Sequence, residues 1–170
     1  MKFQKSLLTA TLLAAASLTA ISANAASTAT NTFPVKLVVT SVCNVKANTT
    51  GIDLGTTQAG LATATTNKGG TNIVLNCSTG ALPIISLIPS NASTVGLGEV
   101  KLDSEVVPYQ LTSDSAGSIV WGNAVGNRVS PAAAVKYATD ITVPVYAAVT
   151  GPADVKPGTY LDTVTVSVAY

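Results

Sequence analysis

The sequence predicts an all-β domain of the sandwich type, and three observations lead to this expectation. Segments rich in Val, Ile, Thr and Tyr alternate with clusters of Gly, Pro, Asn and Ser at the spacing typical of sandwich strands. Several of these segments alternate apolar and polar residues, as half-buried strands do. Once residues 1–25 are set aside, the remaining chain is long enough for one well-buried domain, and no internal repeat or second domain is visible.

Residues 1–25 have the pattern of a secretion signal peptide. Lys2 and Lys5 form a basic start, a mostly apolar run covers residues 6–21, and residues 23–25 form a small-x-small cleavage site. The apolar run is shorter than a membrane-spanning helix normally needs. We therefore expect export, a mature chain that begins at Ala26, and no membrane span after signal removal.

Strands are expected at 33–43, 72–77, 84–88, 106–111, 118–121, 140–149 and 159–170, with a short additional candidate at 52–54. Turn chemistry separates them, for example at 67–70, where Asn, Lys and two glycines follow one another. Pro83 and Pro89 flank one segment and favour an edge strand or a strand that switches sheets. Pro144 interrupts another segment and predicts a bulge there.

The first and last predicted strands carry the same alternating pattern. One face of the first strand holds Phe33, Val35, Leu37 and Val39. One face of the last strand holds Val164, Val166, Val168 and Tyr170. Side chains alternate across a strand, so each apolar stripe must be buried against another surface. The first strand lies just after a secretion signal, where it could reach a neighbouring molecule, and the sequence ends within the last strand. Both features favour assembly over catalysis.

Two cysteines, Cys43 and Cys77, are present. In an oxidising compartment such a pair most simply forms one disulfide. A redox pair or a two-ligand metal site is disfavoured, because the chain has no histidine and the thiols are far apart in sequence. We expect a structural disulfide.

Composition argues against nucleic-acid binding and against catalysis. Without Lys2 and Lys5 the mature chain has seven basic and eight acidic residues, which are scattered and form no basic patch. The absence of histidine excludes Ser-His-Asp and Cys-His constellations and imidazole metal ligands. Asp103 and Glu105 fit a solvated hairpin better than an acid–base pair. We therefore expect no enzyme activity, no metal and no cofactor.

A charged fraction of 10% is low for a lone soluble protein and suits close contact with other protein surfaces.

Two aromatic residues, Tyr109 and Trp121, allow two interpretations. Their rings could form a platform on which a sugar stacks, but a single Trp on a strand is more often core packing. We favour core packing and keep Tyr109 and Trp121 as candidate ligand aromatics.

The mature chain resembles the spore coat U domain family, the pilins of archaic (Csu-type) chaperone–usher pili. Four segments carry the resemblance over essentially all of 26–170. They are the alternating strand from Phe33 before Cys43, the segment 72–77 that ends in Cys77, the segment 142–149 with its Val-Pro step, and the terminal segment 158–170 with a Gly-x-Tyr-x-Asp lead and an aromatic end.

The resemblance implies an incomplete immunoglobulin-like β-sandwich that lacks its final strand and is completed by a donor strand from a neighbouring subunit. It implies a signal peptide over 1–25, a donor extension over 26–42 and a pilin domain over 43–170. Phe33, Val35, Leu37 and Val39 would fill the groove of the next subunit. Val164, Val166, Val168 and Tyr170 would form the acceptor edge and bind the chaperone strand. The implied partners are a periplasmic chaperone, an outer-membrane usher and neighbouring pilin subunits in a head-to-tail polymer.

The resemblance also implies export through the periplasm to an extracellular, cell-surface fimbrium that supports adhesion and biofilm formation. In one alternative the donor strand is 27–33, and 35–42 is the subunit's own first strand. A rival from another class is a monomeric secreted β-sandwich carbohydrate-binding module that caps its groove with its own 33–39 segment. A spore or cyst coat component follows the same polymer logic in another setting.

Overall fold

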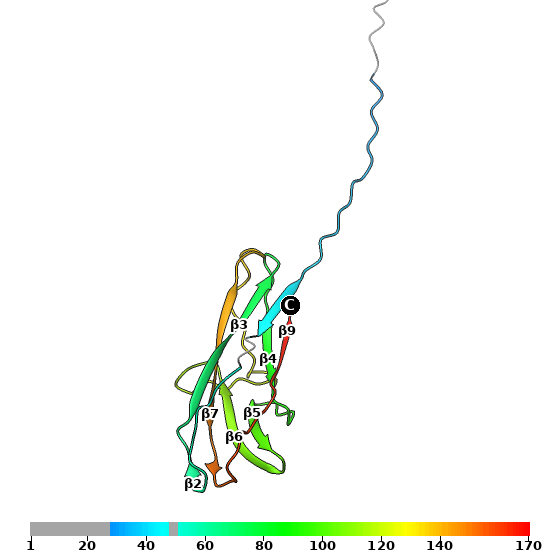
Figure 1. Cartoon of the computed structure of the whole chain (residues 1–170). Helices are drawn as coiled ribbons and strands as arrows, with labels where there is room; N and C mark the ends of the chain where they lie inside the picture. The colour runs from blue at the N-terminus through cyan, green and yellow to red at the C-terminus, as the bar shows by residue number, and fades with distance from the viewer. Residues whose placement is uncertain (1–27, 48–50) are drawn as a thin grey trace, which may run out of the picture. The chain divides into compact units, whose positions relative to one another are not determined.

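The computed structural model describes residues 28–47 and 51–170; the expected signal peptide at 1–25 lies outside the described residues. The contacts between residues divide the chain into two units, with the boundary between Leu37 and Val38, so that the second unit is Val38–Tyr170. The second unit is an all-β domain, as predicted (Figure 1). Its strands are β1 Cys43–Ala47, β2 Leu61–Ala64, β3 Lys68–Cys77, β4 Ile84–Ile88, β5 Leu97–Leu102, β6 Glu105–Thr112, β7 Ile141–Val149, β8 Pro152–Ala153 and β9 Thr165–Ala169. In the part of the chain that the structure describes, no helix is long and apolar enough to cross a membrane.

The strands form one large sheet and two small ones. The large sheet has the order β1-β3-β7-β6-β5, and every pair in it is antiparallel. The β4–β9 pair forms a second layer, and β2 pairs with β8 (Figure 1). Inward side chains of the large sheet, such as Leu75 and Leu111, share one core with Ile85 and Leu87 of β4. Two layers around one core are the architecture of a β-sandwich.

The predicted disulfide is present and joins the start of β1 to the end of β3. Cys43 and Cys77 are paired residues in the β1–β3 register, and their sulfurs are bonded. Cys77 is fully buried in the core. Beside the disulfide, Ser78 and Val42 share three hydrogen bonds: the Ser78 amide and hydroxyl both donate to the Val42 carbonyl, and the Val42 amide donates to Ser78 Oγ. These contacts fix the point at which the N-terminal segment enters the domain.

Several of the expected strands differ in the structure. The segment 33–42 is not a strand and β1 begins only at Cys43, because no described strand offers hydrogen-bond partners to the backbone before that residue. Residues 118–121 contribute only an isolated bridge between Val120 and Thr112. The last strand is shorter than expected, because Leu161 pairs instead with Lys101 of β5 before the chain reaches β4.

The predicted bulge at Pro144 is wrong. The β3–β7 register passes Pro144 without a shift, and β6 pairs with β7 only from Tyr146 onward. One side of β7 therefore has no strand partner at Pro144, where a residue without an N–H is tolerated.

The predicted turn at 67–70 is also displaced, since β3 already begins at Lys68. Gly69 is required there by a close approach: a Cβ at this position would lie 2.0 Å from the carbonyl oxygen of Asp53.

Candidate acceptor groove

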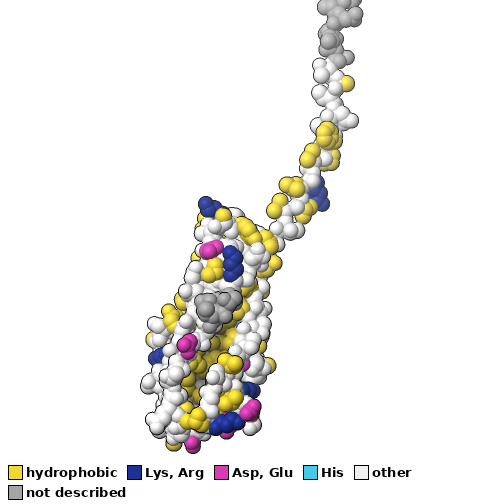
Figure 2. Space-filling view, in the orientation of Figure 1, with side chains coloured by type: hydrophobic (Ala, Val, Ile, Leu, Met, Phe, Trp, Pro, Cys, Tyr) yellow, Lys and Arg dark blue, Asp and Glu magenta, His cyan; other side chains and the backbone are white. Residues whose placement is uncertain are grey.

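A large apolar groove opens into the core of the domain. Its volume is about 780 Å³, and its floor includes Ile73, Leu87, Leu111 and Val145 from both layers. Hydrophobic side chains gather in this hollow in the space-filling view (Figure 2). Protein cores are packed to crystal-like density with few voids larger than a water molecule. A hollow of this size marks the place of a missing structural element.

Strand β9 and the segment that leads into it form one wall of the groove. Val164, Val166 and Val168 are half-buried and pack against the core, whereas Thr165 and Ser167 are exposed. Val164 and Val166 line the groove itself. Tyr170, the last member of the predicted acceptor stripe, is 56% exposed and does not line it.

The hydrogen bonds of β4 show which backbone groups of β9 point to the open edge. Ile85 exchanges both of its backbone hydrogen bonds with Val129 on the side away from β9. Ser86, the next residue, therefore points its amide and carbonyl toward Ser167 of β9, its register partner. By the same alternation, the backbone amides and carbonyls of Val166 and Val168 point away from β4. No described residue pairs with this edge of β9. At this edge, Val166 and Val168 thus combine side chains that face the core with backbone groups that have no partner among the described residues.

An irregular segment, 51–57, also lines the groove and is held by polar contacts. The Asn67 side-chain amide donates to the carbonyls of Leu54 at 2.8 Å and Thr56 at 3.1 Å. Ile52 and Leu54 are half-buried and pack against the core. The expected short strand at 52–54 is absent, but its apolar residues do face the core.

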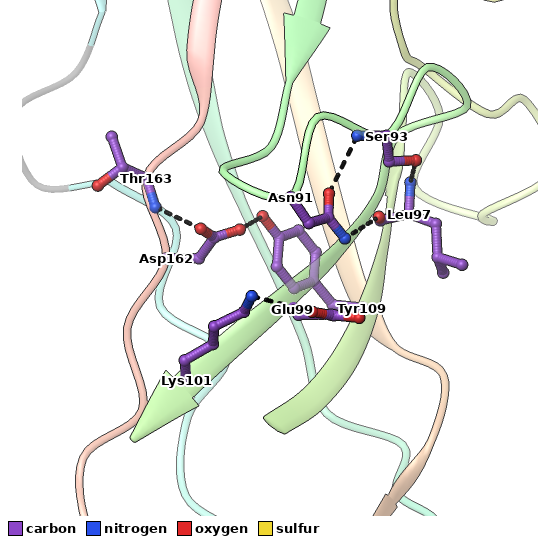
Figure 3. A network of polar contacts seen from close by, with 8 residues as sticks. All are labelled: Asn91, Ser93, Leu97, Glu99, Lys101, Tyr109, Asp162 and Thr163. Atoms are coloured by element: carbon purple, nitrogen blue, oxygen red, sulfur yellow. Dashed lines mark hydrogen bonds and ion pairs between the residues drawn. The ribbon is translucent and has the colours of Figure 1, made fainter. Parts of the chain in front are cut away.

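A buried tyrosine fixes the chain where it enters β9. The Tyr109 hydroxyl donates to Asp162 Oδ2 at 2.6 Å, and Asp162 Oδ1 accepts from the Thr163 amide (Figure 3). Burial, followed by the bond to Asp162 and its negative charge, raises the pKa of Tyr109 well above its usual value, so the phenol remains a neutral donor. The ring lies against Gly98, its cross-strand partner, where a Cβ would come within 2.2 Å of Tyr109. Sequence patterns could not reveal this contact.

A second polar cluster ties the β5–β6 hairpin to the loop before β9. Glu105 Oε2 accepts from the Lys156 amide at 2.6 Å and from the Tyr160 hydroxyl at 3.0 Å. The Lys156 ammonium pairs with Asp103 at 2.8 Å. Desolvation and the contact with Glu105 raise the pKa of Tyr160. Asp103 and Glu105 thus lie at a hairpin, as expected, and both bind the rim of the groove.

The candidate donor residues are exposed. Phe33, Val35, Leu37 and Val39 expose 83–87% of their surface, and no described strand includes them. Val38, which lies between two of them, is exposed as well, so the structure does not distinguish one face of this segment from the other.

The candidate ligand aromatics are part of the core. Trp121 is 0% exposed and Tyr109 is 4% exposed. The Trp121 indole donates to the Ile85 carbonyl at 3.0 Å. Neither ring presents a face to solvent, which fits the core-packing interpretation. Within the described residues no cluster of three or more metal-ligating side chains occurs.

Comparisons with known proteins agree with this architecture. The model of the spore coat protein U domain matches residues 29–167, most of the chain. The chain belongs to the spore coat protein U domain family. The resemblance predicted from the sequence is thereby confirmed. No curated protein matches the chain.

Among solved structures, the domain is similar to a chain in the CsuC–CsuE chaperone–tip adhesion subunit pre-assembly complex from the archaic chaperone–usher Csu pili of Acinetobacter baumannii. The TM-score is 0.54 and the sequence identity is 23%. The match covers 78% of this chain and 40% of the other, so this chain spans less than half the length of its structural relative. The likeness supports the fold, an incomplete sandwich of the pilin type.

Proposed function

We propose that this family member is a structural subunit of a chaperone–usher surface pilus that polymerises by donor-strand exchange. The observation that carries the proposal is the 780 Å³ apolar groove bounded by the unpaired edge of β9. An open edge with apolar pockets is an aggregation hazard unless another strand covers it. An added strand would supply backbone hydrogen bonds to the edge and alternate side chains to the pockets.

The proposed occupant is the N-terminal strand of a second copy of the chain. Phe33, Val35, Leu37 and Val39 offer four apolar side chains at the spacing of a strand, and all are exposed. A donor extension over 26–42 thus precedes a pilin domain over 43–170. Such head-to-tail contacts do not close on themselves, so they build a fibre.

The partners follow from this mechanism. Before assembly, a strand of a periplasmic chaperone covers the groove and contacts Val164, Val166 and Val168, and an outer-membrane usher exports the subunits. The product is an extracellular, cell-surface fimbrium that supports adhesion and biofilm formation. The role is structural and has no catalytic step.

The test is an unboiled denaturing gel of the full chain co-expressed with a matching chaperone and usher. Strand-exchanged contacts open slowly and survive cold detergent as a ladder of multimers. The ladder should disappear on boiling and on deletion of 26–40. Leu37→Asp places a charge on the inward face and should abolish the ladder, whereas the matched control Lys36→Asp on the outward face should preserve it.

A mixing experiment separates the donor from the groove. Leu37→Asp leaves the groove intact, so added Leu37→Asp protein should accept a wild-type donor strand and end the growing polymer. Ladders should shorten as its share of the mixture rises. A single monomer band for the wild type, with and without residues 26–40, would overturn the pilin proposal and favour the self-capped carbohydrate-binding module.

A further inference from the structure

The N-terminal segment 26–42 carries one charged side chain, that of Lys36. Lys36 lies between Val35 and Leu37, in the middle of the apolar row that is proposed to fill the groove of a second copy. Successive side chains of a strand point to opposite faces, so Lys36 faces outward when Val35 and Leu37 face the core. Each inserted strand therefore brings one positive charge to the outer face of the subunit that accepts it.

Three charged residues line the groove, and two of them have partners within the domain. The Lys156 ammonium pairs with Asp103 at 2.8 Å, and Asp162 accepts from the Tyr109 hydroxyl at 2.6 Å. The third is Asp53, which forms no ion pair among the described residues. Asp53 is thus the acidic group at the groove that can receive a cation from outside the domain.

Asp53 lies on the outer side of the segment 51–57. Its neighbours Ile52 and Leu54 are half-buried and pack against the core, whereas Asp53 is exposed. Asp53 Oδ1 accepts from the Gly55 amide at 2.7 Å, and Oδ2 has no partner within the described part of the chain. Because the bond to Gly55 already orders the carboxylate, an ion pair to it restricts only the lysine side chain.

A strand that fills the groove contacts both β9 and the segment 51–57, because both line it. The exposed residues of β9, Thr165 and Ser167, carry no charge. In the segment 51–57, Asp53 is negative and faces outward, as Lys36 does. Opposite charges on one face of neighbouring strands attract, and a long side chain reaches both direct and diagonal neighbours. The charge of the inserted strand is thus complementary to the groove at Asp53.

The apolar row by itself does not determine the register completely. A shift by one residue would put Lys36 into the core. A shift by two residues keeps every inward side chain facing inward and changes only the two ends of the row. Such a shift moves Lys36 by about 7 Å along the strand and takes its ammonium away from Asp53. A contact between these two residues therefore distinguishes registers that the apolar pattern does not.

We propose that Lys36 of one copy forms an ion pair with Asp53 of the copy that accepts its strand, and that this pair fixes the register. The inference rests on the proposed function, since it concerns the same inserted strand. An exposed ion pair adds little to affinity, so the pair selects between registers and does not hold the fibre together. A cold-detergent ladder should therefore persist when Lys36 is replaced.

Coupling with a water-soluble carbodiimide tests the contact in wild-type fibres. The reagent activates a carboxylate, and a lysine amine in contact with it displaces the urea and forms an amide. Treated wild-type fibres should give multimers that survive boiling, with Lys36 joined to Asp53 in peptide mass spectrometry. Lys36→Arg keeps the charge but does not couple, and Asp53→Asn removes the carboxylate. Both variants should keep the unboiled ladder and lose the boiled one.

Dissociation rates of heated fibres in low-salt buffer test whether the two charges act together. Lys36→Gln and Asp53→Asn should each dissociate about twofold to fivefold faster than the wild type. The double variant should be no faster than either single variant, because both changes remove the same contact. Asp53→Asn keeps the oxygen that accepts from Gly55, so the local turn is preserved.

A charge exchange supplies the matched control. Lys36→Glu should dissociate faster than Lys36→Gln, because it places like charges side by side, and a second change, Asp53→Lys, should reverse this effect. Asp154→Lys changes the net charge equally at an exposed residue that does not line the groove, and it should not rescue Lys36→Glu. These differences should shrink in about 1 M salt, which screens exposed charges.

The outcomes distinguish this inference from the proposed function. If the wild type forms no unboiled ladder, donor-strand exchange itself fails and the inference fails with it. If the ladder forms but the treated wild type dissociates completely on boiling, or Asp53→Asn couples as well as the wild type, the pilin proposal stands and the ion pair is refuted. Equal dissociation rates for all the charge variants would refute it as well.

Discussion

Removal of the Cys43–Cys77 disulfide should destabilise the domain by an amount that follows from the structure. The bond closes a loop with a sequence separation of 34. In the chain-entropy model a loop of this length raises the free energy of unfolding by about 3.8 kcal/mol near room temperature. Because Cys77 is fully buried, replacement of both residues by alanine should add a cavity cost of about 1 kcal/mol. The double alanine variant should therefore lose about 4–5 kcal/mol.

The assay is urea unfolding of the full chain, followed by tryptophan fluorescence, with three samples compared. Oxidised wild type, reduced wild type and Cys43→Ala/Cys77→Ala should unfold at successively lower urea concentrations. The reduced wild type keeps the sulfur atoms and isolates the cross-link, so it should account for most of the loss. A total loss below about 1 kcal/mol would refute the argument that the cross-link restricts the unfolded chain. If the reduced wild type is as stable as the oxidised protein but the double alanine variant is less stable, the loss comes from packing rather than from the cross-link.

Three further predictions concern the contacts around the groove. Tyr109→Phe removes the hydrogen bond to Asp162 and should lower the free energy of unfolding by about 1–2 kcal/mol in urea unfolding. Because the pKa of Tyr109 is raised in the fold, the wild type should lose stability as the pH rises above the ordinary tyrosine pKa near 10, and Tyr109→Phe should flatten that loss in thermal unfolding across the alkaline range. Gly98→Val should displace the Tyr109 ring and cost at least about 2 kcal/mol, and NMR shifts of Tyr109 would report the displacement.

The sequence predicts the elements whose boundaries are local. Pro83 and Pro89 flank β4, and its bounds match the expectation at both ends. The alternation of valines around β9 correctly places Val164, Val166 and Val168 on the core side. These features depend only on residues that are close together in the sequence, so a single sequence is enough to predict them.

Strand β5 was missed because its sequence pattern is weak. Leu97–Leu102 contains a glycine and an exposed charged pair, Glu99 and Lys101, at a distance of 3.1 Å. Its pairing depends on β6 and on the close fit of Gly98 under Tyr109. The opposite error occurred at 33–42, where a strong strand pattern has no partner among the described strands. A strand needs neighbours for its backbone groups, and a sequence pattern does not supply them.

The two polar clusters at the rim of the groove lay beyond sequence reasoning for another reason. The Tyr109–Asp162 bond and the Glu105–Tyr160 bond join residues 53 and 55 positions apart, respectively. Each partner alone is an ordinary residue on a strand or in a loop. Only the fold brings them together, and it does so where the chain passes from the large sheet to the β4–β9 layer.

Under the proposed function, the same contacts determine how a fibre would carry tension. A pull on the inserted donor strand passes through Val42, which is hydrogen-bonded to Ser78, to Cys43. The disulfide then transmits it covalently to the end of β3, which is paired on both sides, with β1 and β7. In the accepting subunit, a donor strand pulled along its axis would load its hydrogen bonds to β9 in shear, so they would break together. The path that links one groove to the next donor strand would thus run through a covalent bond and a strand paired on both sides.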